Sequence, residues 1–220
     1  MTPRSLLACT AMCCSLPAAA VLTRPDRDDA EYLELASRYT SALTLPAPGG
    51  EGVLVAPRWV LTSAQRAQAL KGSKGVQSVH VRDAVGLVQM REPVRARTPS
   101  FLYRGDLAGK TVIVVGHGGD GRARAAINTI DRLSPSTFGL RVKPLDEASD
   151  LQGSLTAAEI GAPVYVESAD GIFVAGIHTG SEGQDWTLFA RASAFAEWVD
   201  DVLVAAEREA QEELLGTGTR

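Results

Sequence analysis

Apolar and β-branched residues occur in short runs along most of the chain, and turn-forming residues separate the runs. The runs have the length of strands, and no convincing helical pattern lies between them. The 21 Gly and 11 Pro residues are scattered among them, which favours many turns over long helices. The pattern predicts an antiparallel barrel or sandwich. The runs are Gly52–Ala56, Trp59–Thr62, Val76–Val81, Ala84–Met90, Thr111–Val115, Pro163–Glu167, Ile172–Ile177 and Trp186–Arg191.

The C-terminal tail has a different pattern. Between Ser193 and Leu215, apolar residues recur at helical spacing, and Asp, Glu and Arg occupy the other positions. The sequence therefore predicts one C-terminal helix that packs against the β core, with residues 200–220 as its extension and frayed tail. The apolar stripe consists of Phe195, Trp198, Val199, Val202 and Ala206.

The first 20 residues have the organisation of a cleavable signal peptide. Arg4 gives a positive start, a short apolar stretch follows, and small residues up to Ala20 suit cleavage. The alternatives are a membrane anchor, for which the apolar stretch is too short, and lipidation at Cys9. All three cysteines lie here, so the mature chain would fold without disulfides. We expect a secreted or periplasmic protein, with residues 21–41 as a linker and lead-in to the fold.

Composition and charge narrow the classes of function. The 220 residues are 45% hydrophobic and 22% charged, as in ordinary globular proteins, which excludes a disordered, collagen-like or coiled-coil chain. The length allows one large domain or two packed subdomains. A formal net charge of −4, without any basic run, argues against a nucleic-acid partner.

Two sequence features could indicate a bound nucleotide or a bound metal ion, but each pattern is incomplete. The run Gly116-His-Gly-Gly-Asp-Gly121 fits the dinucleotide fingerprint after a strand, but that fingerprint also needs a following helix and a parallel strand. We interpret it as a glycine turn and expect no nucleotide. The histidines His80, His117 and His178 lack metal-ligand spacing. We expect them on partly exposed strands or loops, and we expect neither a metal nor another cofactor.

Five blocks of the sequence together resemble one enzyme family. The first, Gly52-Val-Leu-Val-Ala-Pro-Arg-Trp-Val-Leu-Thr-Ser-Ala-Gln-Arg66, is similar to the stretch of trypsin-like serine proteases that ends in the catalytic histidine. The blocks follow the order of that family and span residues 42–199. The resemblance implies a trypsin-like domain of two antiparallel β-barrels, with the functional cleft between them. The other four blocks are Asp83–Val94, Ala158–Val164, Val174–Ile177 and Phe189–Trp198.

The catalytic triad is degenerate at the positions that the resemblance implies. The family uses a histidine as general base, an aspartate that orients it and a serine nucleophile. The matching residues are Gln65, Asp83 and Ile160. An amide such as Gln65 does not titrate near neutral pH, and Ile160 has no nucleophilic atom. We therefore expect no peptide-bond hydrolysis.

Further positions implied by the resemblance also differ from the family. The backbone amides that stabilise the oxyanion would belong to Ala158 and Ile160, although glycine is expected at the first of them. The acidic residue between them is Glu159, which leaves its usual buried pairing open. The rest of the cleft would consist of Ser154 at the pocket base, His178 at a substrate-binding serine position, Gly180, and Thr187 at the position of a glycine that keeps the pocket open.

The connection between the first two blocks is short. Gln65 and Asp83 are 18 positions apart, against several tens in the family, which favours a shortened first barrel. We expect the two side chains to face each other in the cleft despite this short connection. A rearranged catalytic pair of His80 with Asp83 would need a bulge, because strand positions three apart face opposite sides.

Different classes of function remain open. One is a non-catalytic homologue that binds a protein or peptide in the former substrate cleft. Another is an active secreted serine endopeptidase whose catalytic residues lie elsewhere, and a third is a scaffold with an empty cleft. The absence of histidine between Leu54 and Val79 favours the first.

Overall fold

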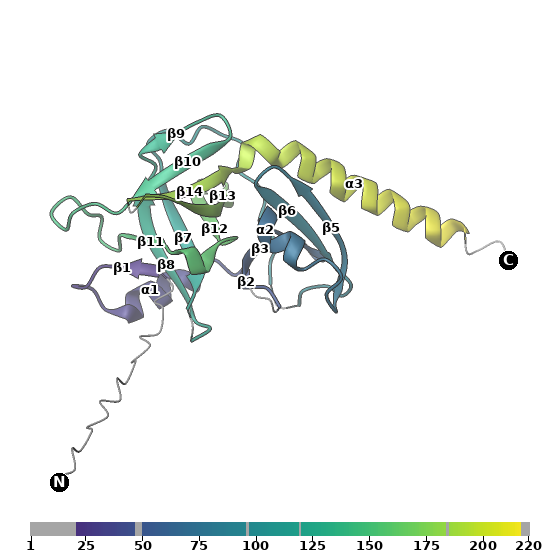
Figure 1. The fold of residues 1–220 in the computed structure, drawn as a ribbon, viewed down its shortest axis with the longest axis horizontal. Coiled ribbons are helices and arrows are strands. Elements are labelled where there is room, and N and C mark those ends of the chain that lie inside the picture. The colour runs from purple at the N-terminus through teal and green to yellow at the C-terminus, as the bar shows by residue number, and fades with distance from the viewer. Residues whose placement is uncertain (1–20, 47–49, 96, 119, 184, 217–220) are drawn as a thin grey trace, which may run out of the picture.

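The computed structural model of the protein consists of two β subdomains followed by a long helix (Figure 1). The predicted signal peptide, residues 1–20, lies outside the part of the chain that the structure describes. The two subdomains and the helix confirm the predicted all-β architecture with a C-terminal helix. The described residues are 21–46, 50–95, 97–118, 120–183 and 185–216.

The first subdomain is a five-stranded antiparallel sheet with the strand order β2-β3-β4-β6-β5. A short helix, α2, follows β4 and leads to the edge strand β5, so few residues connect the strands on either side of it. The elements are β2 (Ala42–Thr44), β3 (Glu51–Ala56), β4 (Trp59–Ser63), α2 (Ala64–Ala69), β5 (Val76–Arg82) and β6 (Val85–Met90).

The second subdomain is a seven-stranded antiparallel sheet with the order β8-β7-β12-β13-β14-β10-β9. Strand β7 continues directly into the antiparallel strand β8, so the glycine-rich run after β7 belongs to a hairpin, without the helix that a dinucleotide site needs. The strands are β7 (Thr111–His117), β8 (Ala123–Thr129), β9 (Arg132–Leu133), β10 (Thr137–Arg141), β12 (Pro163–Ser168), β13 (Gly171–Glu182) and β14 (Trp186–Arg191).

Strands with continuous apolar runs are buried because both of their faces are covered. In β4, Trp59 and Leu61 face the core between the two subdomains, whereas Val60 faces a smaller core under α2. In β7, Ile113 faces the core between the subdomains and its neighbours face the core of the second subdomain. Successive side chains of a strand point to opposite faces, so each of these strands separates two cores and needs apolar residues at every position.

The N-terminal part of the C-terminal helix α3 (Ala192–Gly216) packs against the core between the subdomains. Phe195, Ala196 and Val199 are buried, and the later members of the predicted stripe are partly buried against the same core. Beyond them the helix projects away from the body (Figure 1). No helix in the described part of the chain has the length and apolar character needed to cross a membrane.

An N-terminal arm (residues 21–36) packs against the second subdomain, although it precedes the first one in the sequence. Its strand β1 (Val21–Thr23) pairs with β11 (Gly153–Leu155), and its helix α1 (Asp29–Ala36) contacts β8. The ring of Tyr32 is fully buried there. Its hydroxyl accepts a hydrogen bond from the Arg24 amide at 3.0 Å and donates one to the Gln152 carbonyl at 3.4 Å.

We expect Tyr32→Phe to lower the free energy of unfolding by about 1–2 kcal/mol, because the partly buried Arg24 amide and the buried Gln152 carbonyl would lose their partner. Urea unfolding followed by fluorescence would measure the change. Tyr103→Phe is the matched control, since Tyr103 packs against the same core but its hydroxyl forms no hydrogen bond within the described residues. Equal effects of the two substitutions would contradict the assigned role of the hydroxyl.

Candidate functional site

The residue at the nucleophile position follows a single 3₁₀ turn, η1 (Ala157–Glu159). The side chain of Thr156 caps this turn and accepts a hydrogen bond from the Ala158 amide at 3.3 Å. In return, Oε2 of Glu159 accepts bonds from the amide and the hydroxyl of Thr156, both at 2.6 Å. The amide implied as an oxyanion donor is thus used within the turn itself, and Ile160 lies half-buried at its end.

The segment after Ile160 contacts both subdomains. The Gly161 amide donates to the His178 carbonyl, and the His178 amide donates to the Ala162 carbonyl, both at 2.8 Å. Gly161 has a φ of +100°, and a Cβ there would lie 2.3 Å from Oγ1 of Thr62 and 2.4 Å from the Glu51 carbonyl oxygen. Only glycine allows this backbone conformation together with such a close approach. The turn is therefore held firmly against both sheets.

His178 is fully buried, so the expectation of a partly exposed histidine is wrong here. Its Nδ1 lies 3.0 Å from the carbonyl oxygen of Glu159, and its Nε2 lies 3.1 Å from that of Gly180. Burial lowers the pKa of His178, although the two carbonyl contacts act in the opposite direction. Both ring nitrogens face carbonyl groups, so neither is placed to take a proton from a nucleophile. His178 acts as a structural link between η1 and β13.

A buried acidic cluster lies behind the turn. Glu51 of β3 accepts two hydrogen bonds from His117 of β7, at 2.9 Å from the amide and 2.7 Å between Oε2 and Nδ1. Both side chains are almost completely buried, although His117 as a residue is partly exposed at the end of β7, as expected. Glu159 is buried beside them, and burial raises its pKa to about 7, with a smaller contribution from Glu51. The pair of Glu51 and His117 joins the two sheets, whereas Glu159 bonds only within its own turn.

Gln65 and Asp83 lie close together in the backbone but both point to solvent. The Ala64 amide donates to the Ala84 carbonyl at 2.9 Å, so the residues next to Gln65 and Asp83 are in direct contact. Gln65 is exposed on α2. The Asp83 side chain is 93% exposed in the β5–β6 turn and reaches only Arg82, at 4.0 Å. Within the described residues, no hydrogen bond connects either side chain to the turn at Ile160. That they face each other across a cleft remains a prediction.

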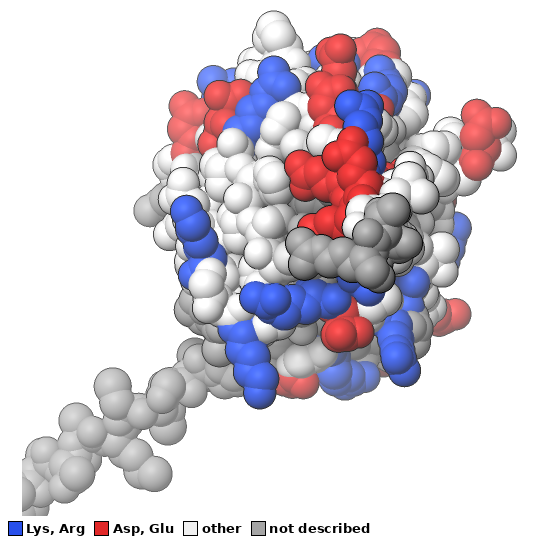
Figure 2. Space-filling model, turned by 90° about the vertical axis from the view of Figure 1, so that its right-hand side faces the viewer, with Lys and Arg blue, Asp and Glu red and all other residues white. Residues whose placement is uncertain are grey.

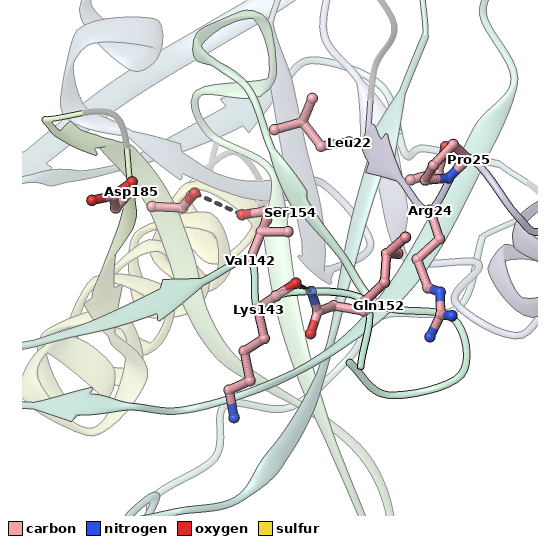
Figure 3. A pocket seen from close by; sticks show the side chains of 11 residues that line it. Leu22, Arg24, Pro25, Val142, Lys143, Gln152, Ser154 and Asp185 are labelled. Atoms are coloured by element: carbon pink, nitrogen blue, oxygen red, sulfur yellow. Dashed lines mark hydrogen bonds between the residues drawn. The ribbon is translucent and has the colours of Figure 1, made fainter. Parts of the chain in front are cut away.

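Two residues assigned to the specificity pocket are in direct contact. Ser154 of β11 and Thr187 of β14 are buried, and their hydroxyl oxygens lie 2.6 Å apart. They close the inner end of a pocket of about 320 Å³, whose rim includes Arg24 and Lys143 (Figure 3). Both cations are engaged, because Arg24 pairs with Asp26 and Lys143 lies 3.3 Å from an Asp131 oxygen. The hydroxyl pair adds polar groups to a pocket that also has apolar lining residues such as Leu22 and Val142.

Gly180 marks an open part of the same region. It has a φ of +149°, follows a bulge in β13, and has free space where a Cβ would point. Of the residues implied for the cleft, Gly180 and the half-buried Ile160 remain accessible, whereas Ser154 and His178 are buried. This region thus offers an accessible surface near the pocket that Ser154 and Thr187 line.

A serine and histidine pair does lie within hydrogen-bond distance, on the edge strand β5 of the first sheet. Oγ of Ser78 is 3.1 Å from Nε2 of His80, and its hydroxyl donates to Oε1 of Gln89 at 2.8 Å. Since the hydroxyl hydrogen goes to Gln89, Nε2 of His80 must itself donate and cannot act as the base. The sequence could have indicated this pair, because positions two apart on a strand share a face.

The next question is whether side chains in the described part of the chain could hold a metal ion. Within the described ranges, no group of three or more His, Cys, Asp or Glu side chains is arranged to hold a metal ion. The cluster of Glu51, His117 and Glu159 is the densest set of titratable groups near the turn, and its hydrogen bonds are already satisfied by protein partners. Sequence reasoning missed this cluster because its members come from three distant segments.

The sheets, the clamped turn and the C-terminal helix define a fold of the trypsin-like type. The crystal structure of the scabies mite inactivated protease paralogue S-I1 is similar, with a TM-score of 0.56 and 15% identity. The match covers 77% of this chain and 96% of that one. The similarity confirms the fold that the sequence resemblance implied. No protein-family model matches the sequence, and no curated protein matches it either.

Proposed function

We propose that the chain is a trypsin-like pseudoprotease that binds a protein or peptide and does not cleave it. The observation that carries this proposal is the state of the turn at Ile160. The nucleophile position holds an alkyl side chain, and the neighbouring Ala158 amide is bonded to Thr156 instead of facing a substrate. Acyl transfer needs a nucleophile, a base and free oxyanion donors. The turn has no nucleophile, and one of its two implied oxyanion donors, the Ala158 amide, is already bonded.

The binding part of the proposal rests on the surface near Gly180. A strand with an open position near the pocket lined by Ser154 and Thr187 suits the capture of an extended segment, since little conformational entropy is lost on the protein side. Half-buried Ile160 would offer an apolar contact to such a segment. The partner class is therefore a protein or peptide, and neither a nucleotide nor a nucleic acid.

Peptides selected on the wild-type protein from a random displayed library should bind Gly180→Arg at least about tenfold more weakly, because the new side chain would fill the open position. Gly183→Arg is the control, since Gly183 also has a positive φ and open space but lies beyond the end of β13. Binding would be measured by fluorescence anisotropy, and folding by thermal unfolding. The absence of any enriched peptide, or equal binding by both variants, would refute the proposed surface.

The alternative function is an active serine endopeptidase that uses Ser78 and His80, and their 3.1 Å separation is the observation that favours it. The pair lacks a third group that orients the histidine, and the hydroxyl donates to Gln89. Labelling of the protein by a fluorophosphonate probe, abolished by Ser78→Ala, would support this alternative.

We also propose that the protein is exported, with removal of residues 1–20. The basis is the order of charged, apolar and small residues in that segment. The described residues contain no cysteine, so the fold needs no oxidising compartment. Mass spectrometry of the protein recovered outside the cytoplasm would give the mature N-terminus. An intact Met1 in that fraction would contradict cleavage.

A further inference from the structure

A groove of about 510 Å³ lies between the C-terminal helix and the first sheet, and it contains none of the residues discussed for the cleft. One side of the groove is the helix α3, and the other is formed by residues of β4, β5 and β6. Its floor consists of uncharged polar and aromatic side chains, and its helical wall carries two carboxylates. The residues that matter here are Trp59, Ser78, His80 and Gln89 on the floor, and Asp201 and Glu209 on the wall.

The wall concentrates negative charge. The helix carries seven acidic residues and one basic residue, whereas the rest of the chain carries 19 acidic and 21 basic residues. Acidic side chains gather on the projecting helix beside an uncharged surface (Figure 2). Asp200 pairs with Arg104, but Asp201 and Glu209 form no ion pair within the described residues. The two carboxylates that face the groove are therefore available to a cationic ligand.

The spacing of these carboxylates restricts the ligand. Asp201 and Glu209 are eight positions apart on one face of the helix, with the small residue Ala205 between them, which corresponds to about 12 Å along the axis. In an extended peptide, residues four apart point to the same side and are separated by about 13 Å. Basic residues at positions i and i+4 of an extended segment would therefore reach both carboxylates.

The floor of the groove favours an extended backbone. Strand β5 pairs with β6 on one side only and forms the edge of its sheet, and an edge strand exposes main-chain groups that can pair with a further strand. The side chains of Ser78 and Gln89 add hydroxyl and amide groups along the floor. The exposed ring of His80, which lies 5.8 Å from the ring of the buried Trp59, adds an aromatic face on which a guanidinium group can stack.

We propose that this groove binds an extended segment of a partner protein with two arginine or lysine residues four positions apart. The site differs from the surface near Gly180, so this proposal stands or falls independently of the pseudoprotease proposal. Charge complementarity with Asp201 and Glu209 selects a basic segment, and the edge strand selects an extended one.

The test uses a fluorescent seven-residue peptide, Thr-Arg-Val-Thr-Val-Arg-Thr, and a peptide of the same composition with the two arginines adjacent. The full-length mature protein should bind the spaced peptide at least about tenfold more tightly than the adjacent one in an anisotropy titration. The double variant Asp201→Asn/Glu209→Gln should lose this binding about tenfold or more. Raising the salt concentration should weaken the wild-type complex, because the contacts are exposed ion pairs.

The matched control is Glu207→Gln/Glu212→Gln, which removes the same charge from α3 at exposed positions outside the groove. It should change the affinity less than about twofold. Equal losses in the two double variants would mean attraction to the helix as a whole and would overturn the site. The proposal also fails if both peptides bind equally or if neither binds. Concentration-dependent dimerisation that Asp201→Asn/Glu209→Gln abolishes would instead assign the groove to a second copy of the chain.

Discussion

The purified mature protein is expected to hydrolyse no peptide or ester substrate and to leave a fluorophosphonate probe unreacted. Loss of the nucleophile and base together removes a factor of about 10⁶ in turnover in serine proteases. The activity that remains in such enzymes comes from the oxyanion hole and from substrate binding. Here the oxyanion hole is weakened as well, because the Ala158 amide is already bonded to Thr156. A mixed peptide library analysed by mass spectrometry, together with the probe, measures both properties.

Restoring the two missing side chains should not restore the activity. In Gln65→His/Ile160→Ser, the new histidine would stand on an exposed turn of helix, and Asp83 points to solvent in the neighbouring turn. No buried carboxylate would orient the imidazole, and the oxyanion donor would still be tied to Thr156. Efficient turnover by this double variant would show that the turn at Ile160 rearranges easily. Labelling of the unmodified protein that depends on Ser78 would instead support the endopeptidase alternative.

Glu159→Gln is expected to stabilise the protein above neutral pH by about 3 kcal/mol. Burial raises the pKa of Glu159 to about 7, from an ordinary value near 4.5, and each pKa unit corresponds to about 1.4 kcal/mol. A carboxyl whose pKa is raised by folding stabilises the native state while it is protonated. The contribution of Glu159 to the free energy of unfolding is therefore complete below about pH 4.5, and it is lost as the pH rises to about 7. Glutamine can still accept the two hydrogen bonds from Thr156.

Urea unfolding at several pH values would test this prediction. The wild-type protein and the variant should be equally stable near pH 4 and should diverge between pH 4.5 and 7. His178 has the opposite pH dependence, because its pKa is lowered by folding and its contribution to the free energy of unfolding is lost at acidic pH. This contribution is the same in the wild type and the variant, so it cancels when their free energies of unfolding are subtracted. Glu92→Gln, at an exposed carboxylate, is the control and should show no divergence. Parallel curves for the wild type and Glu159→Gln would contradict the assigned burial effect.

The strands could be predicted because their signal is local. Runs such as Thr111–Val115 have the length and composition of covered strands, and the helical stripe around Phe195 and Val199 indicated where the last helix packs. The buried polar contacts could not be predicted in this way. His117 finds its carboxylate 66 positions away, and His178 finds its carbonyl partner 19 positions away. Such pairs depend on the packing of two sheets, for which no periodicity in the sequence gives a signal.

The position of Asp83 shows a second limit. The sequence placed it at the start of a strand, where a side chain facing the cleft was reasonable. In the structure it occupies a tight turn with a φ of 50°, a left-handed conformation that aspartate tolerates better than most residues. The turn directs its carboxylate to solvent. The aspartate at this position of the second block therefore indicated which segment corresponds to the family, but it did not indicate the direction of the Asp83 side chain.

The docking of the N-terminal arm also sets an order of events during synthesis. Its hydrogen bonds to Ser149 and Gln152 join residues 125 and 120 positions apart, whereas the strands of the first subdomain all lie between residues 42 and 90. A chain that emerges from its N-terminus can complete the first sheet from local contacts, but the arm cannot complete its docking until both β8, which contacts α1, and β11, which pairs with β1, have been made. Such distant contacts raise the contact order and slow folding. Until then the ring of Tyr32 cannot be fully buried, and it remains accessible to a chaperone or a protease.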